Sequence, residues 1–293
     1  FVCEMSLNAQ QILALSTFSG VGKQAILKIG NSCSGTIETA ELLDLLEIYS
    51  IKARNPSGKG KIPITRQDID MAMSKADAII KQAKDHQIGL ISYYDEIFPQ
   101  NLRETRTEDG KKEDPPIFLF YKGNIAAIQD PCLAIIGTRN NSIGAEKAGL
   151  YLAEEFARRG FCIVSGLALG CDTIAHRGAL NIGGRTIAFL AHGLDTIYPS
   201  QNKQLAHDIV KNGGLLLSEY KIGTPVTSYN LVNRDRLQAG IALATLVIQT
   251  GIKGGTIHAA KNCINSGKPL FVVKYADEKT DKDEKTQGNH LLV

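Results

Sequence analysis

Glycine, arginine and lysine recur in short turns along the second half of this 293-residue chain. The turns are Gly137-Thr-Arg139, Ser165-Gly-Leu-Ala-Leu-Gly-Cys-Asp172 and Gly251-Ile-Lys-Gly-Gly-Thr256. Glycine allows backbone N–H groups to approach an anion closely, and a helix that follows adds the positive end of its dipole. Arginine and lysine add charge-assisted hydrogen bonds to phosphate. These residue types predict a phosphate-bearing ligand.

The elements that hold these turns follow from the apolar pattern. Six short and almost uninterrupted apolar runs alternate with helical stretches, as expected for strands of a parallel sheet covered on both faces by helices. The runs span residues 133–136, 162–165, 186–190, 215–217, 245–248 and 270–273. In an open parallel sheet the turns after the strands line one crevice at their carboxyl ends. The sequence therefore predicts an α/β fold with its ligand at that edge.

The chain divides into three predicted parts. Residues 1–84 form a small helical N-terminal domain of the SAM or helix-hairpin-helix kind, 85–276 form the α/β domain, and 277–293 form a charged, disordered tail. Within the helical part, Gly20-Val-Gly22 separates two helical segments. Such a turn aims backbone amides at a DNA phosphate in some proteins and is a plain connection in others. The plain connection is the favoured interpretation.

Composition excludes several classes of protein. No apolar stretch approaches the roughly 20 residues of a membrane span, and no secretory signal is visible. Six cysteines occur without a Cys-x-x-Cys pair, which argues against a zinc site or a disulfide framework and favours the cytoplasm. The net charge of +3 does not by itself indicate a nucleic-acid ligand. With 6% aromatic residues, stacking on bases is limited, so DNA binding would depend mainly on phosphate and on salt.

A succession of motifs then resembles one known family. Eight segments follow one another in the order of the DNA-processing protein A family (DprA, also called Smf), at residues 94–102, 114–123, 136–139, 165–172, 175–180, 193–202, 217–220 and 233–236. Residues 13–29 also resemble the small helical domain of that family. The resemblance implies an extended Rossmann-like parallel sheet, no cofactor and no catalysis. It also implies binding of single-stranded DNA, loading of a RecA-type recombinase in natural transformation or recombination, and pairing into a homodimer.

The resemblance further implies which residues bind DNA. Carried over to matching positions, the set comprises glycines, basic residues and small polar residues of the turns: Gly137, Arg139, Ser165, Gly166, Gly170, Asn202, Lys203, Asn233, Arg234, Arg236, Lys253, Gly254, Gly255 and Thr256. Two segments depart from the family pattern. Asp235 stands between two arginines where the family usually has Asn, and Gly254-Gly-Thr256 replaces the family's Gly-Ser-Leu.

Two other functions are compatible with this type of sheet. Phosphoribohydrolases carry a glutamate three residues after the threonine of a Gly-Gly-x-Gly-Thr turn, whereas this chain has Ala259 three residues after Thr256. A nucleotide-sensing module is the other alternative. Asp172 and His176 lie four residues apart and could form an acid–base pair, although a structural hydrogen bond of the histidine is the favoured interpretation. No group of residues has the spacing of a metal site.

Overall fold

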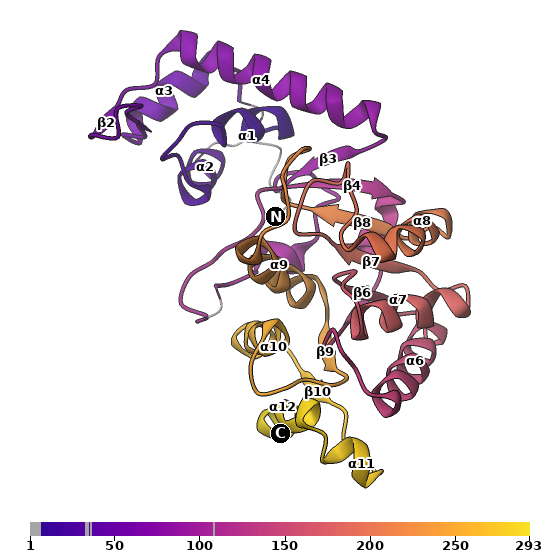
Figure 1. Ribbon diagram of the computed structural model, residues 1–293. Coiled ribbons are helices and arrows are strands. Elements are labelled where there is room, and N and C mark those ends of the chain that lie inside the picture. Colours follow the sequence, from indigo (N-terminus) through magenta and orange to yellow (C-terminus); the bar gives the residue numbers. More distant parts are fainter. Residues whose placement is uncertain (1–6, 33–34, 36, 108) are drawn as a thin grey trace. The chain divides into compact units, whose positions relative to one another are not determined.

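The computed structural model describes residues 7–32, 35, 37–107 and 109–293. The chain forms two compact units (Figure 1). The first comprises Phe1–Phe98 with Ile117–Leu119, and the second comprises Pro99–Pro116 with Phe120–Val293. The first unit therefore extends beyond the predicted boundary at residue 84, because β3 (Gly89–Ser92) contacts α1 and α4 of that unit.

The first unit is mainly helical, as its apolar periodicity predicts. It contains α1 (Ala9–Leu15), α2 (Lys23–Gly30), α3 (Glu41–Ile48) and α4 (Arg66–Asp85), with the two-stranded antiparallel pair β1 (Ala53–Arg54) and β2 (Lys61–Ile62). Capping boxes begin two of these helices, with Asn8 and Gln11 at α1 and Thr65 and Asp68 at α4. Fully buried aliphatic side chains of α1, α2 and α3 form the interior.

The second unit is built on the predicted sheet. Its strands are β5 (Cys132–Ile136), β6 (Cys162–Ser165), β7 (Thr186–Phe189), β8 (Leu215–Ser218), β9 (Ala244–Val247) and β10 (Leu270–Val272). Within this unit the strand order is β10-β9-β5-β6-β7-β8-β4, and β4 (Phe118–Gly123) runs antiparallel to β8. The six strands from β10 to β8 pair in parallel. The predicted α/β class and parallel sheet are confirmed.

Helices cover both faces of this sheet (Figure 1). Successive strand residues point to opposite faces, and Ile135 packs with α6 (Ile143–Arg158) and α7 (Cys171–Asn181), whereas Ile136 packs with α10 (Gly255–Asn265). The remaining helices of the unit are α5 (Gln100–Arg103), α8 (Lys203–Lys211) and α9 (Ser228–Ile241), with short 3-10 turns at Ile125–Gln129 and Ser200–Asn202. Burial on both faces explains why the strands read as continuous apolar runs.

The C-terminal segment corrects one prediction. Residues 277–293 were expected to be disordered, but they form α11 (Glu278–Asp281), a 3-10 turn at Glu284–Thr286 and α12 (Gln287–Leu292). The buried Asn289 accepts a hydrogen bond from Thr250 N–H and donates to the carbonyls of Ile248 and Val273. Gln249 donates to Thr286 Oγ1. A few buried polar side chains hold this segment in place through hydrogen bonds, while most of its charged side chains are exposed. Amino-acid composition does not reveal such hydrogen bonds.

Among the described residues, no helix is long and apolar enough to cross a membrane, and no group of three or more His, Cys, Asp or Glu side chains is arranged to hold a metal ion. Cys132, Cys162, Cys171 and Cys263 are free and buried. Cys3 and Cys33 lie outside the described residues.

Candidate nucleic-acid interface

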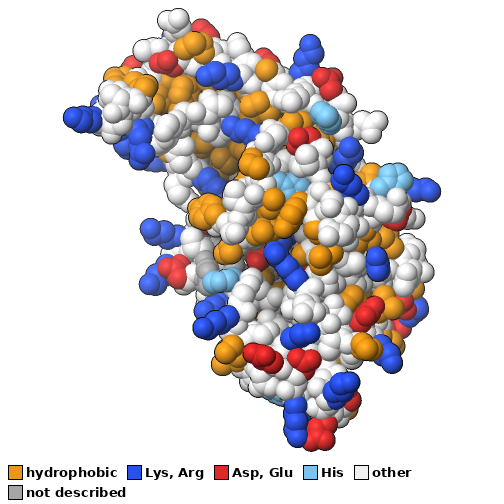
Figure 2. All heavy atoms as spheres, in the orientation of Figure 1, with side chains coloured by type: hydrophobic (Ala, Val, Ile, Leu, Met, Phe, Trp, Pro, Cys, Tyr) orange, Lys and Arg blue, Asp and Glu red, His pale blue; other side chains and the backbone are white. Residues whose placement is uncertain are grey.

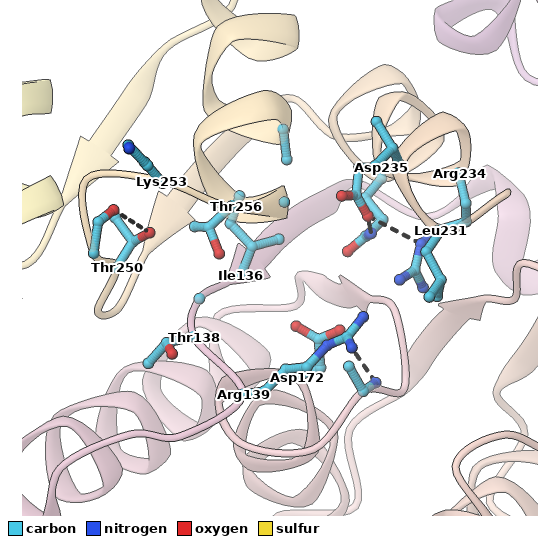
Figure 3. Close-up of a pocket in the computed structure, with 18 of the residues that line it drawn as sticks. Ile136, Thr138, Arg139, Asp172, Leu231, Arg234, Asp235, Thr250, Lys253 and Thr256 are labelled. Carbon is cyan, nitrogen blue, oxygen red and sulfur yellow. Dashed lines mark hydrogen bonds and ion pairs between the residues drawn. The ribbon is translucent and has the colours of Figure 1, made fainter. Parts of the chain in front are cut away.

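A cavity of about 450 Å³ lies at the carboxyl ends of β5 and β9, as predicted from the order of strands and turns (Figure 3). We call it the strand-end pocket. Its wall consists of the turn after β5, the turn between β9 and α10, the first turn of α7, and one side of α9. Seven residues of the predicted set line it: Gly137, Arg139, Arg234, Lys253, Gly254, Gly255 and Thr256.

Arg139 is the exposed cation of the turn after β5. The backbone of this turn is fixed from two sides, because Thr138 N–H donates to the Gln249 carbonyl and Cys171 N–H donates to the Thr138 carbonyl. Gly170 has φ of +77°, and a Cβ there would lie 2.3 Å from the Thr138 carbonyl oxygen. Only glycine permits both this conformation and this approach. Arg139 therefore extends from a rigid backbone toward the pocket (Figure 3).

Arg234 lies at the same pocket but is buried, with 4% of its side chain exposed. Its Nη1 donates to the carbonyls of Gly166 and Phe189, at 2.6 and 2.5 Å, and its Nε is 3.1 Å from Asp235 Oδ1. A Cβ on Gly166 would lie 2.0 Å from Arg234 Nη1. Arg234 thus ties the ends of β6 and β7 to α9 and contributes positive charge from inside the wall.

Arg236 does not line the strand-end pocket. Its Nε is 2.6 Å from Asp114 Oδ2, its Nη1 is 2.8 Å from Glu219 Oε2, and Nη1 also donates to the Asn233 carbonyl. Burial by itself would lower the pKa of Arg236, but the carboxylates of Glu219 and Asp114 raise it. The arrangement indicates a structural ion triad for Arg236, and Asn233 supplies its carbonyl to that triad.

The long turn after β6 is held from beneath by buried polar side chains. Asp172 accepts hydrogen bonds from Gly166 N–H and Ala168 N–H, at 3.1 and 3.2 Å. Asn202 donates to the carbonyls of Leu167 and Ala168. Burial raises the pKa of the Asp172 carboxyl, against the opposing effect of Arg234. These contacts fix the turn as a preformed part of the pocket wall.

His176 belongs to the same support. Its Nε2 accepts from Leu167 N–H at 3.3 Å, so Nδ1 carries the proton and donates to Thr186 Oγ1 at 2.7 Å, which in turn donates to the Ile163 carbonyl. Burial lowers the pKa of His176 to about 3, which keeps the ring neutral. Asp172 and His176 each bond to the backbone of the turn. These contacts support the structural interpretation of His176, and they do not support an acid–base pair.

Six other residues of the predicted set lie outside the lining of the strand-end pocket: Ser165, Gly166, Gly170, Asn202, Lys203 and Asn233. Ser165 is buried at the end of β6 and donates from Oγ to the Ile135 carbonyl. Lys203 begins α8 and is exposed, but it does not line the cavity. The resemblance to the family was the signal for both residues, and it does not reveal which way a side chain points.

One face of α9 contributes pocket residues that sequence reasoning missed. Ser228, Leu231, Val232, Asp235 and Gln238 all line the cavity, at positions i, i+3, i+4, i+7 and i+10 along the helix. That spacing places them on one helical face. The face was detectable from the sequence once a helix was assigned to residues 228–241.

Asp235 is the acidic member of that face. Its Oδ1 accepts from Arg234 Nε and Gln238 Nε2, at 3.1 and 3.0 Å. Its Oδ2 faces the start of α10, where a Cβ on Gly255 would lie 3.0 Å from that oxygen. Burial raises the pKa of Asp235 to about 6, with Arg234 opposing the shift and the charge of Asp172 adding to it.

A small apolar niche of about 60 Å³ adjoins the strand-end pocket through the shared residues Arg139, Ala168, Leu231 and Arg234. Gly166, Leu169, Tyr198 and Pro199 complete it, and Tyr198 and Leu169 are 46% and 40% exposed. An exposed tyrosine ring beside the strand-end pocket offers a surface on which a nucleobase can stack. Two further tyrosines of the second unit, Tyr220 and Tyr229, do not line the niche.

Charge elsewhere on the surface is mixed. On the face drawn in Figure 2, Lys and Arg side chains of the second unit are interspersed with Asp and Glu side chains. This agrees with the net charge of only +3. The local arrangement at the strand-end pocket, with Arg139 and Lys253 beside the glycine turn of α10, is therefore the feature that favours an anionic ligand.

Comparison with known proteins places these observations in context. The model of the family described as DNA recombination-mediator protein A matches residues 89–293. Protein Smf of Escherichia coli is 34% identical over 194 residues, which cover 66% of this chain and 49% of that protein. The chain thus spans about half the length of this curated relative.

Two solved structures are similar. The X-ray structure of DNA processing protein A from Streptococcus pneumoniae has a TM-score of 0.75 and 26% identity, covering 98% of this chain and 93% of that one. A structure of DNA processing protein A from Helicobacter pylori, described in terms of its single-stranded DNA binding mode, has a TM-score of 0.59 and 30% identity, covering 70% and 86%.

Proposed function

Because this chain belongs to the family of DNA recombination-mediator protein A, we propose that it binds single-stranded DNA at the strand-end pocket. The observation that carries this proposal is the convergence of Arg139, Lys253 and the glycine turn of α10 on one cavity of about 450 Å³. The Helicobacter pylori relative, which is described as binding single-stranded DNA, supports it.

The cavity suggests how the strand is held. Phosphate oxygens accept hydrogen bonds from the Arg139 guanidinium and from backbone amides at the start of α10, and Lys253 adds a mobile charge. A base next to that phosphate stacks in the niche at Tyr198. Because these contacts are to the backbone and to a ring face, they distinguish flexible single strands from duplex but do not read sequence.

We also propose a role for this binding in the cell. The chain delivers single-stranded DNA to a RecA-type recombinase in the cytoplasm during recombination or natural transformation, and it does so without catalysis. The family description as a recombination mediator supports this role. At the position of the glutamate of phosphoribohydrolases, Ala259 contributes only a methyl group to the pocket.

We also propose that the chain works as a homodimer. The predicted surface lies within residues 237–275, and four large apolar side chains of that range are at least half exposed, namely Leu243, Ile252, Ile264 and Phe271. Phe271 belongs to β10, the terminal strand in the order of the sheet. Two linked copies double the number of DNA contacts along one strand and raise avidity. Sedimentation at micromolar concentration tests this, and a monomer throughout would contradict it.

A nucleotide-sensing module remains the second candidate, because the volume of the pocket lies in the range of small-ligand sites. One titration separates the candidates. Labelled oligo-dT, the matching duplex, and linear and cyclic nucleotides are each titrated against the protein at low and high salt. We expect oligo-dT to bind more tightly than duplex and to lose affinity steeply with salt. Tighter binding of a mononucleotide, or affinity that does not change with salt, would refute the proposal.

A further inference from the structure

The carboxylate of Asp235 stands where an anion would bind. Its Oδ2 faces Gly255, the first residue of α10, with 3.0 Å between that oxygen and the position of a Cβ on Gly255. The positive end of the α10 dipole attracts negative charge at this point. Asp235 and Thr256 both line the strand-end pocket, from opposite helices (Figure 3). The carboxylate of Asp235 therefore lies at the same end of α10 to which a DNA phosphate would bind.

The same carboxylate also engages a cation of the pocket. Oδ1 is 3.1 Å from Arg234 Nε and 3.0 Å from Gln238 Nε2. The other contacts of Arg234 go to the carbonyls of Gly166 and Phe189. Asp235 therefore neutralises part of the positive charge that Arg234 would otherwise present to a ligand.

Several charged groups surround Asp235 from the neighbouring elements. Arg234 is on its own helix, Asp172 comes from α7, Arg139 comes from the turn after β5, and Lys253 comes from the turn before α10. Only 13% of the Asp235 side chain is exposed, so water screens these interactions weakly. A second negative charge brought here by DNA is repelled by both carboxylates.

We propose that Asp235 is an internal competitor for phosphate, so that the strand-end pocket holds DNA more tightly when this carboxylate is protonated. This inference rests on the proposed function, since it needs a phosphate ligand in the same cavity. It assigns to Asp235 control over the strength of DNA binding, and it makes the pocket responsive to mild acidification.

The coupling between anion binding and protonation of Asp235 sets the direction of the pH effect on DNA affinity. Binding of an anion beside Asp235 favours its protonated form and so raises its pKa further in the complex. DNA affinity then increases as pH falls through about 6, the pKa of Asp235 in the free protein. Replacement by asparagine keeps an oxygen acceptor for Arg234 and removes the charge. The gain from Asp235→Asn at pH 7.5 should therefore equal the gain that the wild type shows on acidification, about tenfold for a shift of one pKa unit.

The test compares pH profiles. Oligo-dT of about 20 nucleotides with a pH-insensitive dye is titrated against wild type, Asp235→Asn and His258→Gln at about 0.1 M salt, from about pH 5 to 8. His258 lies on α10 outside the pocket lining, and His258→Gln is the matched control for a polar substitution on the helix that Asp235 faces. We expect wild type and His258→Gln to gain about tenfold on acidification, while Asp235→Asn stays at the high affinity throughout.

Each other outcome has a distinct meaning. If the affinity of the wild type for oligo-dT does not change with pH, or if Asp235→Asn gains as much affinity on acidification as the wild type, the role of Asp235 is overturned. Either result leaves the proposed function standing. An acid gain that disappears in His258→Gln assigns the effect to the histidine and also overturns it. Absence of binding by all three proteins at every pH refutes the proposed function instead. If Asp235→Asn does not fold, the profiles of wild type and His258→Gln still decide.

Discussion

Two arginine-bearing regions of the second unit, alike in sequence, have different roles in the structure. In the turn after β5, Arg139 is exposed at the rim of the strand-end pocket. In the segment 233–236 on α9, Arg234 and Arg236 are both buried and bond to carbonyls and carboxylates of the chain itself. A basic residue in a DNA-binding family is therefore not by itself a DNA contact. What decides is whether its guanidinium still faces solvent after the chain has folded.

The difference has a physical origin in the partners available to each arginine. The turn that carries Arg139 is fixed by backbone hydrogen bonds, which leave the side chain to project from it. Arg236 instead lies between Asp114, which comes from before β4, and Glu219, which follows β8. This triad is costly to break, because Arg236 is buried and Glu219 is only 12% exposed, so little water replaces the lost contact. The first region favours ligand binding, and the second favours a specific fold.

The largest expected effect lies in the second region. Arg236→Met should reduce the free energy of unfolding by about 3–5 kcal/mol, because it leaves Asp114 and Glu219 without their shared cation. Denaturant unfolding measures this, with Arg158→Met as the matched control, since the Arg158 ion pairs are exposed and contribute at most about 1 kcal/mol. Equal stability of the two variants would show that the triad is not structural.

The next effect tests the first region. Arg139→Ala should weaken oligo-dT binding by about 1–3 kcal/mol through loss of a charge-assisted phosphate contact, and leave thermal unfolding nearly unchanged. Arg159→Ala, an exposed arginine at the end of α6, should bind like wild type. Similar affinities of both variants would place the DNA elsewhere.

A smaller effect concerns the acidic residue between the two buried arginines. The folded-state pKa of Asp235, about 6, exceeds the ordinary value of 3.8, so its charged form destabilises the fold increasingly as pH rises from about 4 through 6. Asp235→Asn should therefore stabilise the protein by about 1–2 kcal/mol at pH 7.5 and by almost nothing below pH 4. Thermal unfolding across this range checks it. A constant difference at all pH values would mean that packing, and not charge, is responsible.

The smallest effect is expected at Lys203. It is exposed on α8 and does not line the strand-end pocket, so Lys203→Ala should change oligo-dT affinity by less than about 0.5 kcal/mol at 0.1 M salt. Lys253→Ala, from the pocket wall, is the comparison and should cost more. A loss at Lys203 as large as that at Lys253 would extend the DNA path from the pocket to α8.

The predictions from sequence succeeded where neighbours along the chain decide. The six apolar runs became the six parallel strands from β10 to β8, and the glycine turns after β5 and β9 came together at their carboxyl ends. The helical first unit followed from apolar periodicity, and the structure adds capping boxes at Asn8 and Thr65. Local steric rules and alternation of burial suffice for these features.

Prediction failed where distant segments decide. The segment 277–293 contains many charged residues, yet Asn289 and Thr286 hold it to the chain near Thr250 through buried hydrogen bonds. The extent of the first unit also depends on contacts of β3 with α1 and α4. Composition averages over residues, whereas a few well-placed polar side chains are enough to order a segment.

The amino-acid sequence by itself thus determined the α/β class, the order of the strands along the chain and the edge of the sheet at which glycine and basic residues gather. Tertiary structure alone decided which cations line the pocket. Arg139 and Lys253 line the pocket, Arg234 braces its wall, and Arg236 is directed to Asp114 and Glu219. The physical reason is that a guanidinium binds whichever oxygen lies within reach, and only the folded chain determines whether that oxygen belongs to the protein or to its ligand.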